Sequence, residues 1–138
     1  VVEKKIWEIW ASHKVPQIDL LMDRGIKLLN NNNLNEALVV FNLILEQAPD
    51  FSEAWNKRAT IYFLMGDFRK SMQDIKSTLA LEPRHFGAIS GLGLIFNVLE
   101  RPELALKAFR RVKEIYPLSR SAKKFIRKLN KTIPLLRL

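Results

Sequence analysis

Apolar and polar residues alternate along the chain with the period of an α-helix, in segments separated by short turns. Large apolar side chains recur at intervals of three and four residues, which places them on one face of each predicted helix. Three of these segments end at a proline, and the intervals from Pro49 to Pro83 and from Pro83 to Pro117 are both 34 residues. Proline cannot continue a helix, because it lacks the amide hydrogen and its ring collides with the preceding turn. A proline at a constant interval therefore indicates the end of each copy of a repeated unit.

The chain aligns with itself as three copies, over residues 18–51, 52–85 and 86–119. The eighth and twentieth places of each copy are small, and they hold Gly25, Ala59, Gly93, Ala37, Ser71 and Ala105. The fourth, eleventh and twenty-fourth places are large and apolar, and they hold Leu21, Trp55, Ile89, Leu28, Tyr62, Phe96, Phe41, Ile75 and Phe109. Two helices of a hairpin approach closely only where small residues face the partner helix, and large residues fill the remaining space. Each copy is therefore predicted to be a helical hairpin.

Each copy carries, between its two predicted helices, a candidate for a left-handed backbone conformation. The candidates are Asn32, Gly66 and Glu100. Glycine tolerates this conformation best, and asparagine tolerates it better than most other residues. Pro102 follows Glu100 near the start of the next predicted helix, where proline is accepted.

The middle copy carries the repeated pattern most completely, with Trp55, Ala59, Tyr62, Gly66, Phe68 and Pro83. With the 34-residue period, these positions resemble the tetratricopeptide repeat (TPR), a helix–turn–helix unit, over residues 18–119. The resemblance implies an all-α fold, a right-handed superhelical solenoid of three repeats. It also implies capping helices at both ends, over 1–17 and 120–138, because a stack of repeats exposes apolar faces at its termini.

Four residues depart from the family pattern. Arg24 and Arg58 stand where an aliphatic residue is usual, and Ile44 and Val112 stand where alanine is usual. The charge of Arg58 has a candidate partner, because Asp74 lies on the second predicted helix of the same hairpin. We expect Arg58 to pair with Asp74 within ion-pair range, about 4 Å.

Both ends of the chain carry amphipathic patterns that suit capping helices. Ile6, Trp10 and His13 share one face of the first predicted helix and could cover the first copy. After the third copy, a helix is predicted at about 120–133. Its apolar face consists of Ala122, Phe125, Ile126, Leu129 and Ile133.

Charge is concentrated at the C-terminal end. The net charge is +9, yet residues 1–106 carry 12 basic and 13 acidic side chains, whereas residues 107–138 carry 11 basic side chains and one acid. The polar face of the last predicted helix is basic and consists of Lys123, Lys124, Arg127, Lys128 and Lys131. Such a face is either a solvated surface or a binding site for an acidic partner.

Candidate catalytic and metal chemistry is sparse. There is no cysteine, and the two histidines, His13 and His85, lie in separate helical units without ligand spacing. His85 follows the turn at Pro83, where we expect it to cap a helix or form a hydrogen bond. Asp19 and Asp23 share a helix face, but two carboxylates make a poor calcium site and a solvated face is the favoured interpretation. The sequence therefore predicts no enzyme, no metal and no cofactor, and no apolar run reaches the roughly 18 residues of a membrane span.

In TPR proteins, the first helices of the hairpins line a concave groove that receives peptides. The resemblance places nine residues there: Met22, Ile26, Leu29, Asn56, Thr60, Phe63, Ser90, Leu94 and Asn97. The asparagines would bond a peptide backbone, and the apolar residues would accept its side chains. The alternative, that some of these side chains pack between hairpins or beneath the N-terminal helix, stays open.

Family members that bind the acidic C-terminus of chaperones use lysine, arginine and asparagine at five groove places. Here those places hold Met22, Ile26, Lys57, Gly87 and Gly91, so a free carboxylate is not the expected ligand. The expected function is non-enzymatic binding of a protein or peptide partner in the groove. The alternative is an acidic partner on the basic helix, whether an acidic protein, an anionic membrane surface or nucleic acid. Nucleic acid is the least favoured, because no base-stacking aromatic residues are interleaved with the charges.

The stretches "IWEIWASH" and "LALEPRHFGAISGLG" also resemble a group of small bacterial TPR proteins. Members of that group commonly begin with an export signal, so the resemblance favours the periplasm, with the cytoplasm as the alternative. The first residue is Val1 rather than methionine, and we expect a shortened or processed form.

Overall fold

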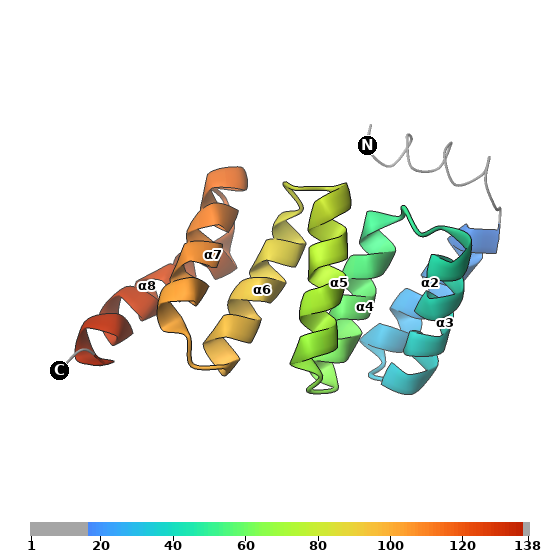
Figure 1. The fold of residues 1–138 in the computed structure, drawn as a ribbon, viewed down its shortest axis with the longest axis horizontal. Helices are drawn as coiled ribbons and strands as arrows, with labels where there is room; N and C mark the ends of the chain where they lie inside the picture. The colour runs from blue at the N-terminus through green and yellow to red at the C-terminus, as the bar shows by residue number, and fades with distance from the viewer. Residues whose placement is uncertain (1–16, 137–138) are drawn as a thin grey trace.

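The computed structural model describes residues 17–136, and the structural statements below refer to that part of the chain. Its helices are α2 (Gln17–Asn30), α3 (Leu34–Gln47), α4 (Ser52–Leu64), α5 (Phe68–Leu81), α6 (Phe86–Val98), α7 (Pro102–Ile115) and α8 (Arg120–Leu136). They form a row of three hairpins, α2–α3, α4–α5 and α6–α7, with α8 packed against α7 at the end (Figure 1). The described residues contain no strand. The predicted capping helix over 1–17 lies outside these residues, except that Gln17 already begins α2.

The turns between hairpins repeat one geometry. Phe51, His85 and Ser119 each donate a backbone N–H to the carbonyl three residues earlier, at 3.1 Å in every case. The three periodic prolines lie inside these turns. Within the hairpins, Asn32, Gly66 and Glu100 have φ of 61°, 81° and 57°. The left-handed positions predicted from the sequence are thus confirmed in all three copies.

The small residues at the eighth and twentieth places of each copy allow the two helices of a hairpin to pack closely. A Cβ atom added to Gly25 would lie 2.8 Å from the Phe41 ring, and one added to Gly93 would lie 2.8 Å from the Phe109 ring. Phe41 and Phe109 are both buried. The first and third hairpins therefore pack a phenylalanine of the second helix directly against a glycine of the first helix.

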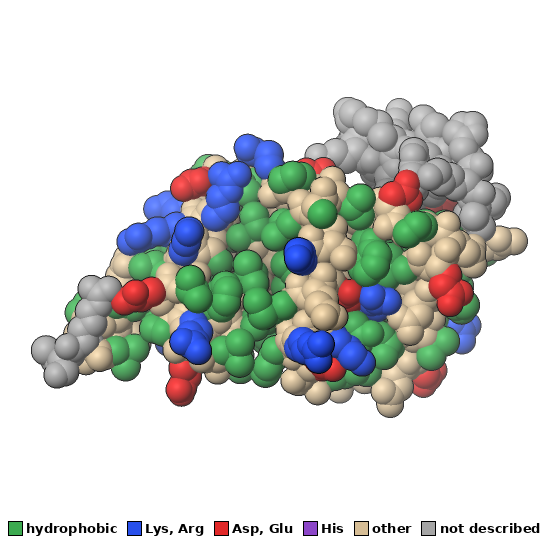
Figure 2. Space-filling model, in the orientation of Figure 1, with side chains coloured by type: hydrophobic (Ala, Val, Ile, Leu, Met, Phe, Trp, Pro, Cys, Tyr) green, Lys and Arg blue, Asp and Glu red, His purple; other side chains and the backbone are tan. Residues whose placement is uncertain are grey.

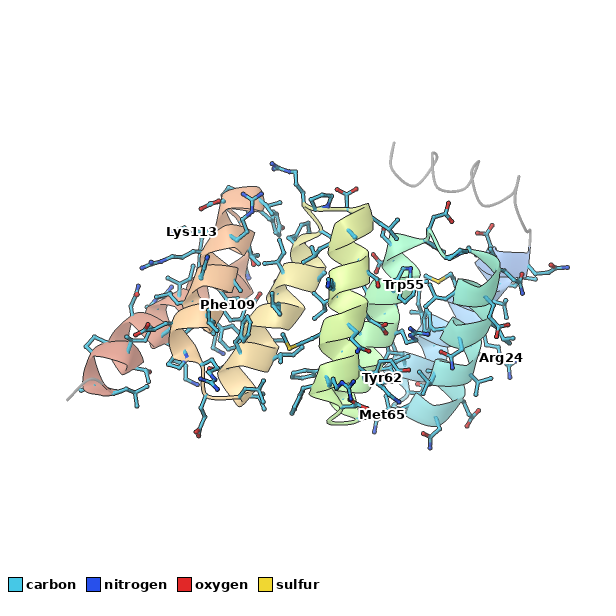
Figure 3. All side chains as sticks on the ribbon, in the orientation of Figure 1. Arg24, Trp55, Tyr62, Met65, Phe109 and Lys113 are labelled. Atoms are coloured by element: carbon cyan, nitrogen blue, oxygen red, sulfur yellow. The ribbon has the colours of Figure 1, made fainter. Side chains whose placement is uncertain are left out.

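Arg58 and Asp74 form the predicted ion pair. The guanidinium donates through Nε to Asp74 Oδ2 at 2.8 Å and through Nη2 to Oδ1 at 2.9 Å. It also donates to Asn42 Oδ1 at 3.0 Å, so that one side chain links α3, α4 and α5. Its Cζ lies 5.0 Å from the ring of Trp55 and 5.6 Å from the ring of Tyr62, both labelled in Figure 3. The hydrogen bond to Asp74 raises the pKa of Arg58 further, against the opposing effect of burial.

Helix α8 covers the end of the third hairpin. Ala122, Leu129 and Ile133 are buried, and the Phe125 ring stacks on Phe109 with a centroid distance of 4.5 Å. The helix extends three residues beyond the predicted end and contains Pro134.

The opposite face of α8 does not follow the repeat. Lys123, Arg127 and Asn130 stand 34 residues after Ile89, Gly93 and Phe96 of α6, and all three are exposed. Where the earlier hairpins have a small residue against which the next helix packs, α8 has an arginine. The exposed face of α8 therefore lacks the small residue that the earlier first helices present to their partner helix.

Candidate functional site

The first helices of the hairpins form a continuous inner row, because α4 contacts both α2 and α6. In Figure 1, α3 and α5 lie nearer the viewer than α2 and α4, so this inner row is on the far side. The predicted groove places of the three copies therefore fall on neighbouring helices.

A small hollow of about 60 Å³ opens between α4 and α6. It is lined by Asn56, Ala59, Thr60, Phe63, Ser71, Ile75, Gly87, Gly91 and Leu94. Four of the nine predicted groove residues, Asn56, Thr60, Phe63 and Leu94, are among them. The structure thus brings together the predicted residues of the second copy and one of the third.

The other five predicted groove residues lie outside this hollow. Met22 is 6% exposed and belongs to the core of the first hairpin. Ile26 and Leu29 are partly buried and pack against that same core. Ser90 and Asn97 are half-buried on α6, away from the lining of the hollow. The packing alternative left open by the sequence describes Met22, whereas the partly buried Ile26 and Leu29 stay predictions for the groove.

The hollow exists because α6 carries glycines on its inner side. A Cβ atom added to Gly91 would lie 3.5 Å from Ile75 Cδ1, which is ordinary contact, and one added to Gly87 would lie 3.5 Å from Asn56 Nδ2. With no side chain at these positions, the hollow reaches through to Ser71 and Ile75 of α5. From the sequence, Gly87 and Gly91 stand out only as groove places without a cation, and nothing in it points to Ser71 and Ile75 of the second helix as part of the site.

Hydroxyl groups at the hollow are already hydrogen-bonded within the chain. Ser71 Oγ donates to the Ala59 carbonyl at 2.7 Å, and Thr60 Oγ1 donates to the Asn56 carbonyl at 3.2 Å. Phe63 packs on Phe68 with a centroid distance of 5.5 Å. The lining is therefore apolar in character, and the amide of Asn56 is its most prominent polar group.

Glu53 and His85 connect the two helices next to the hollow. His85 caps α6, because its Nδ1 accepts the Ala88 N–H at 3.1 Å, and its Nε2 lies 2.9 Å from Glu53 Oε2. With Nδ1 as acceptor, the neutral ring carries its proton on Nε2 and donates it to Glu53. Burial alone would raise the pKa of Glu53, but the hydrogen bond from His85 and the charge of that ring when it is protonated, with contributions from Lys57 and Asn56, lower it below its ordinary value. The capping role expected of His85 is confirmed.

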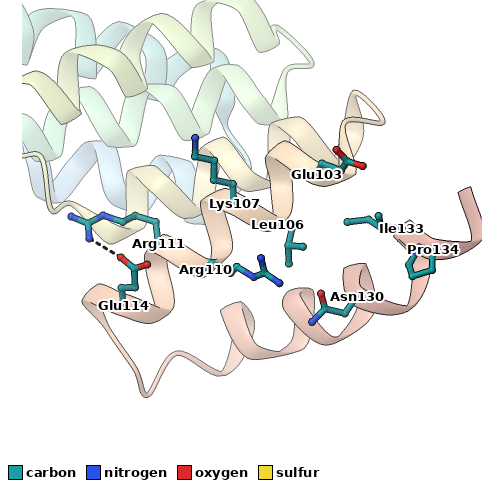
Figure 4. A pocket seen from close by; sticks show the side chains of 9 residues that line it. All are labelled: Glu103, Leu106, Lys107, Arg110, Arg111, Glu114, Asn130, Ile133 and Pro134. Atoms are coloured by element: carbon teal, nitrogen blue, oxygen red, sulfur yellow. Dashed lines mark hydrogen bonds and ion pairs between the residues drawn. The ribbon is translucent and has the colours of Figure 1, made fainter. Parts of the chain in front are cut away.

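A second, wider hollow of about 670 Å³ lies between α7 and α8 (Figure 4). Arg110 points into it toward Asn130, and Leu106, Ile133 and Pro134 supply apolar surface. Arg111 pairs with Glu114 at 3.0 Å. Figure 2 shows cationic side chains gathered over this end of the molecule.

The predicted basic face of α8 is exposed along its whole length. It consists of Lys123, Lys124, Arg127, Lys128 and Lys131, preceded by the equally exposed Arg120. None of these side chains forms an ion pair with an acidic residue in the described part of the chain.

The described residues contain no group of three or more His, Cys, Asp or Glu side chains placed to hold a metal ion. Asp23 pairs with Lys27 at 3.1 Å on an exposed face. No helix between residues 17 and 136 is both long enough and apolar enough to cross a bilayer.

Comparison with known proteins places this geometry among repeat proteins. No protein-family model matches the sequence. A TPR repeat-containing protein of Rhizobium etli is 39% identical over 120 residues, which are 87% of this chain and 59% of that protein. Small glutamine-rich tetratricopeptide repeat-containing protein 2 of Saccharomyces cerevisiae is 27% identical over 83% of this chain and 33% of its own length. The chain thus spans about three-fifths or less of these relatives.

Solved structures share the fold. The Sgt2 TPR domain of Aspergillus fumigatus superposes with a TM-score of 0.81 at 21% identity, covering 90% of this chain and 83% of that domain. The first TPR domain of Spaghetti (RPAP3), solved with the HSP90 peptide SRMEEVD, gives a TM-score of 0.79 at 24% identity, covering 86% and 94% of the two chains. The repeated turns, the close hairpins and these similarities lead to one conclusion: the chain folds as an all-α TPR solenoid and is similar in sequence to tetratricopeptide-repeat proteins.

Proposed function

We propose that the protein is a non-enzymatic interaction module that binds a peptide segment of a partner protein on its inner row of helices. The observation that carries this proposal is the hollow in which Asn56, Thr60, Phe63 and Leu94 come together. The similar RPAP3 domain was solved with a bound peptide, which supports peptide binding as the kind of function. The periplasm, which the sequence favours, stays a prediction for the location.

The ligand need not resemble the HSP90 peptide. That peptide is acidic, whereas the three groove places where its binders carry lysine or arginine hold Met22, Gly87 and Gly91 here. The two asparagine places hold Ile26 and Lys57. Lys57 lies 3.8 Å from Glu53, which already offers it a counter-charge. We therefore propose an internal peptide segment as the ligand, in place of a free acidic C-terminus.

Selection from a random peptide library displayed on phage tests the proposal. We expect the wild-type protein to retain a family of related sequences, and an Asn56→Ala/Phe63→Leu variant to lose them. Gln73→Ala, on the exposed side of α5, is the matched control and should retain them. Circular dichroism must show that each variant is folded. A folded double variant that retains the same peptides at unchanged affinity would contradict peptide binding in this groove.

A second candidate function is electrostatic binding of an acidic partner through α8. The supporting observation is the row of exposed cations that have no acidic partner among the described residues. Binding of this kind should weaken steeply with salt, because exposed charges more than about 10 Å apart are screened at 0.1 M. We expect a fluorescent poly-glutamate peptide to dissociate below half-molar salt, and Lys124→Glu/Lys128→Glu to abolish its binding. Binding that survives half-molar salt would contradict this function.

A further inference from the structure

We infer that the hollow between α4 and α6 receives a single uncharged aliphatic side chain of the bound peptide, such as leucine, isoleucine or methionine. The inference rests on the proposed function and adds the chemistry of one anchor residue. It concerns the side of the groove formed by Ala59, Phe63, Ile75, Gly91 and Leu94.

The volume of the hollow suits one side chain of this size. A cavity requires about 10–15 Å³ to hold one water molecule. The hollow, with about 60 Å³, is several times larger than that and is still small, which suits one side chain and not several.

The charge of the lining matches an uncharged ligand. None of the nine lining residues is ionisable, and the hydroxyl groups of Thr60 and Ser71 already donate to carbonyls of the chain. The nearby cation Arg58 is engaged with Asp74. A charged side chain would lose its hydration in the hollow and find no counter-charge among the nine lining residues, while the adjacent Glu53 is already bonded to His85, so its entry is unfavourable. An aliphatic side chain would lose only its exposed apolar surface, which is favourable.

Gly91 supports a ligand because helix packing does not require it. Gly93 lies two residues away in the same helix, and a Cβ atom there would collide with the Phe109 ring at 2.8 Å. A Cβ atom at Gly91 would instead make ordinary contact with Ile75 at 3.5 Å. Glycine inside a helix is unfavourable relative to alanine. The space that this glycine leaves therefore has no structural use in the chain, whereas it provides a site for a ligand.

The test compares peptide selections by the wild-type protein, Gly91→Ala and Gly91→Leu. Ala80→Leu adds similar bulk at an exposed position of α5 and is the matched control. We expect the peptides retained by the wild type to share one uncharged aliphatic position. Replacing that residue by serine, or Gly91 by leucine, should weaken binding of the synthetic peptide by about ten- to hundredfold. The amidated and free-acid forms of the peptide should bind alike, and the thermal midpoint of Gly91→Ala should be unchanged or higher.

The possible outcomes distinguish a failure of the aliphatic anchor from a failure of peptide binding itself. Retained peptides without a common aliphatic position, or binding that Gly91→Leu leaves unchanged, would overturn the anchor and leave the proposed function standing. A strict requirement for a free carboxylate would instead contradict the internal peptide segment proposed above as the ligand. If Gly91→Leu does not fold, the affinity of Gly91→Ala for the synthetic peptide is the deciding measurement. An affinity within twofold of that of the wild type would then overturn the inference. A library that yields no binder to the wild type would overturn both the function and the anchor.

Discussion

Arg58 occupies a position where this repeat usually has an aliphatic side chain, and the chain compensates its charge internally. The Asp74 side chain that receives it is only 5% exposed. Two parallel hydrogen bonds fix the guanidinium, and the rings of Trp55 and Tyr62 lie beside it. A buried ion pair of this kind holds helices in one arrangement, because removal of either partner leaves a charge without compensation.

We expect Asp74→Ala to lower the free energy of unfolding by about 3 kcal/mol, because it strands the charge of Arg58. The double variant Arg58→Met/Asp74→Leu should recover most of this loss, since it removes both charges and retains bulk. Urea unfolding followed by circular dichroism measures both values. A single variant as stable as the wild type would show that the pair contributes little.

The pKa of Glu53 leads to a prediction about pH. Its lowered pKa means that the carboxylate stabilises the folded state above its ordinary value of 4.5, and that this contribution is lost as the pH falls through the lower pKa of the folded protein. Glu53→Gln lacks this contribution. The difference in unfolding free energy between wild type and Glu53→Gln should therefore shrink as the pH is lowered from 5 toward 3. The side chain is 40% exposed, so the effect is screened by salt. A difference that stays constant over this range would exclude the coupling.

Helix α6 shows how one residue type can have different roles within a single element. Gly93 is required because the Phe109 ring lies against it, whereas Gly91 faces a hollow and has free space. The helix thus combines one glycine that serves packing with another that leaves a surface open.

These environments predict opposite effects of the same substitution. Gly93→Ala should destabilise the protein by about 1–3 kcal/mol, because the added methyl group overpacks the hairpin. Gly91→Ala should stabilise it by about 0.5–1 kcal/mol, because alanine is the better helix residue and its Cβ fits. Thermal and urea unfolding of both variants test the contrast. Equal effects of the two substitutions would refute the assignment of roles.

The elements of the fold were predictable from the sequence because their signals are local and repeated. The prolines, the left-handed turn positions and the small places each recur in three copies, so each copy supports the others. The pairing of Arg58 with Asp74 was predictable because Arg58 stands where an aliphatic residue is usual and Asp74 supplies a counter-charge on the second helix of the same hairpin. The apolar face of α8 was also readable, although Pro134 gave no sign that the helix would continue through it to Leu136.

The candidate site was only partly predictable from the sequence, since the hollow depends on side chains that are missing at two glycines. Spacing alone assigns Met22 and Asn56 to comparable positions of the groove, but the first hairpin buries Met22. The hollow depends on the missing side chains of Gly87 and Gly91, which open a path to Ser71 and Ile75 on the neighbouring hairpin. No pattern of residue types along one helix reports such a gap between two helices.

As a whole, the molecule is a row of hairpins in which each unit is stabilised mainly by its neighbours. Such a stack behaves nearly as a one-dimensional array, so that local damage is felt first in adjacent units. Helix α8 is the last member of the described row, and the buried face of the third hairpin depends on it.

We expect Leu129→Ala, at a position only 3% exposed, to cost about 2–5 kcal/mol. Hydrogen exchange measured by mass spectrometry should become faster in α7 and α8, while α2 and α3 keep their protection under native conditions. Uniform acceleration along the whole chain would show that the array unfolds as a single cooperative unit.

The arginine that α8 carries in place of a small residue also limits how these molecules can assemble. A stack of like hairpins has no inherent length, and an end that accepted another hairpin would allow copies to join into filaments. Arg127 stands where the earlier hairpins have a small residue, so its side chain occupies space that the helix of an added hairpin would need. The same side chains that make this end attractive to acidic molecules thus disfavour continued stacking onto the exposed face of α8.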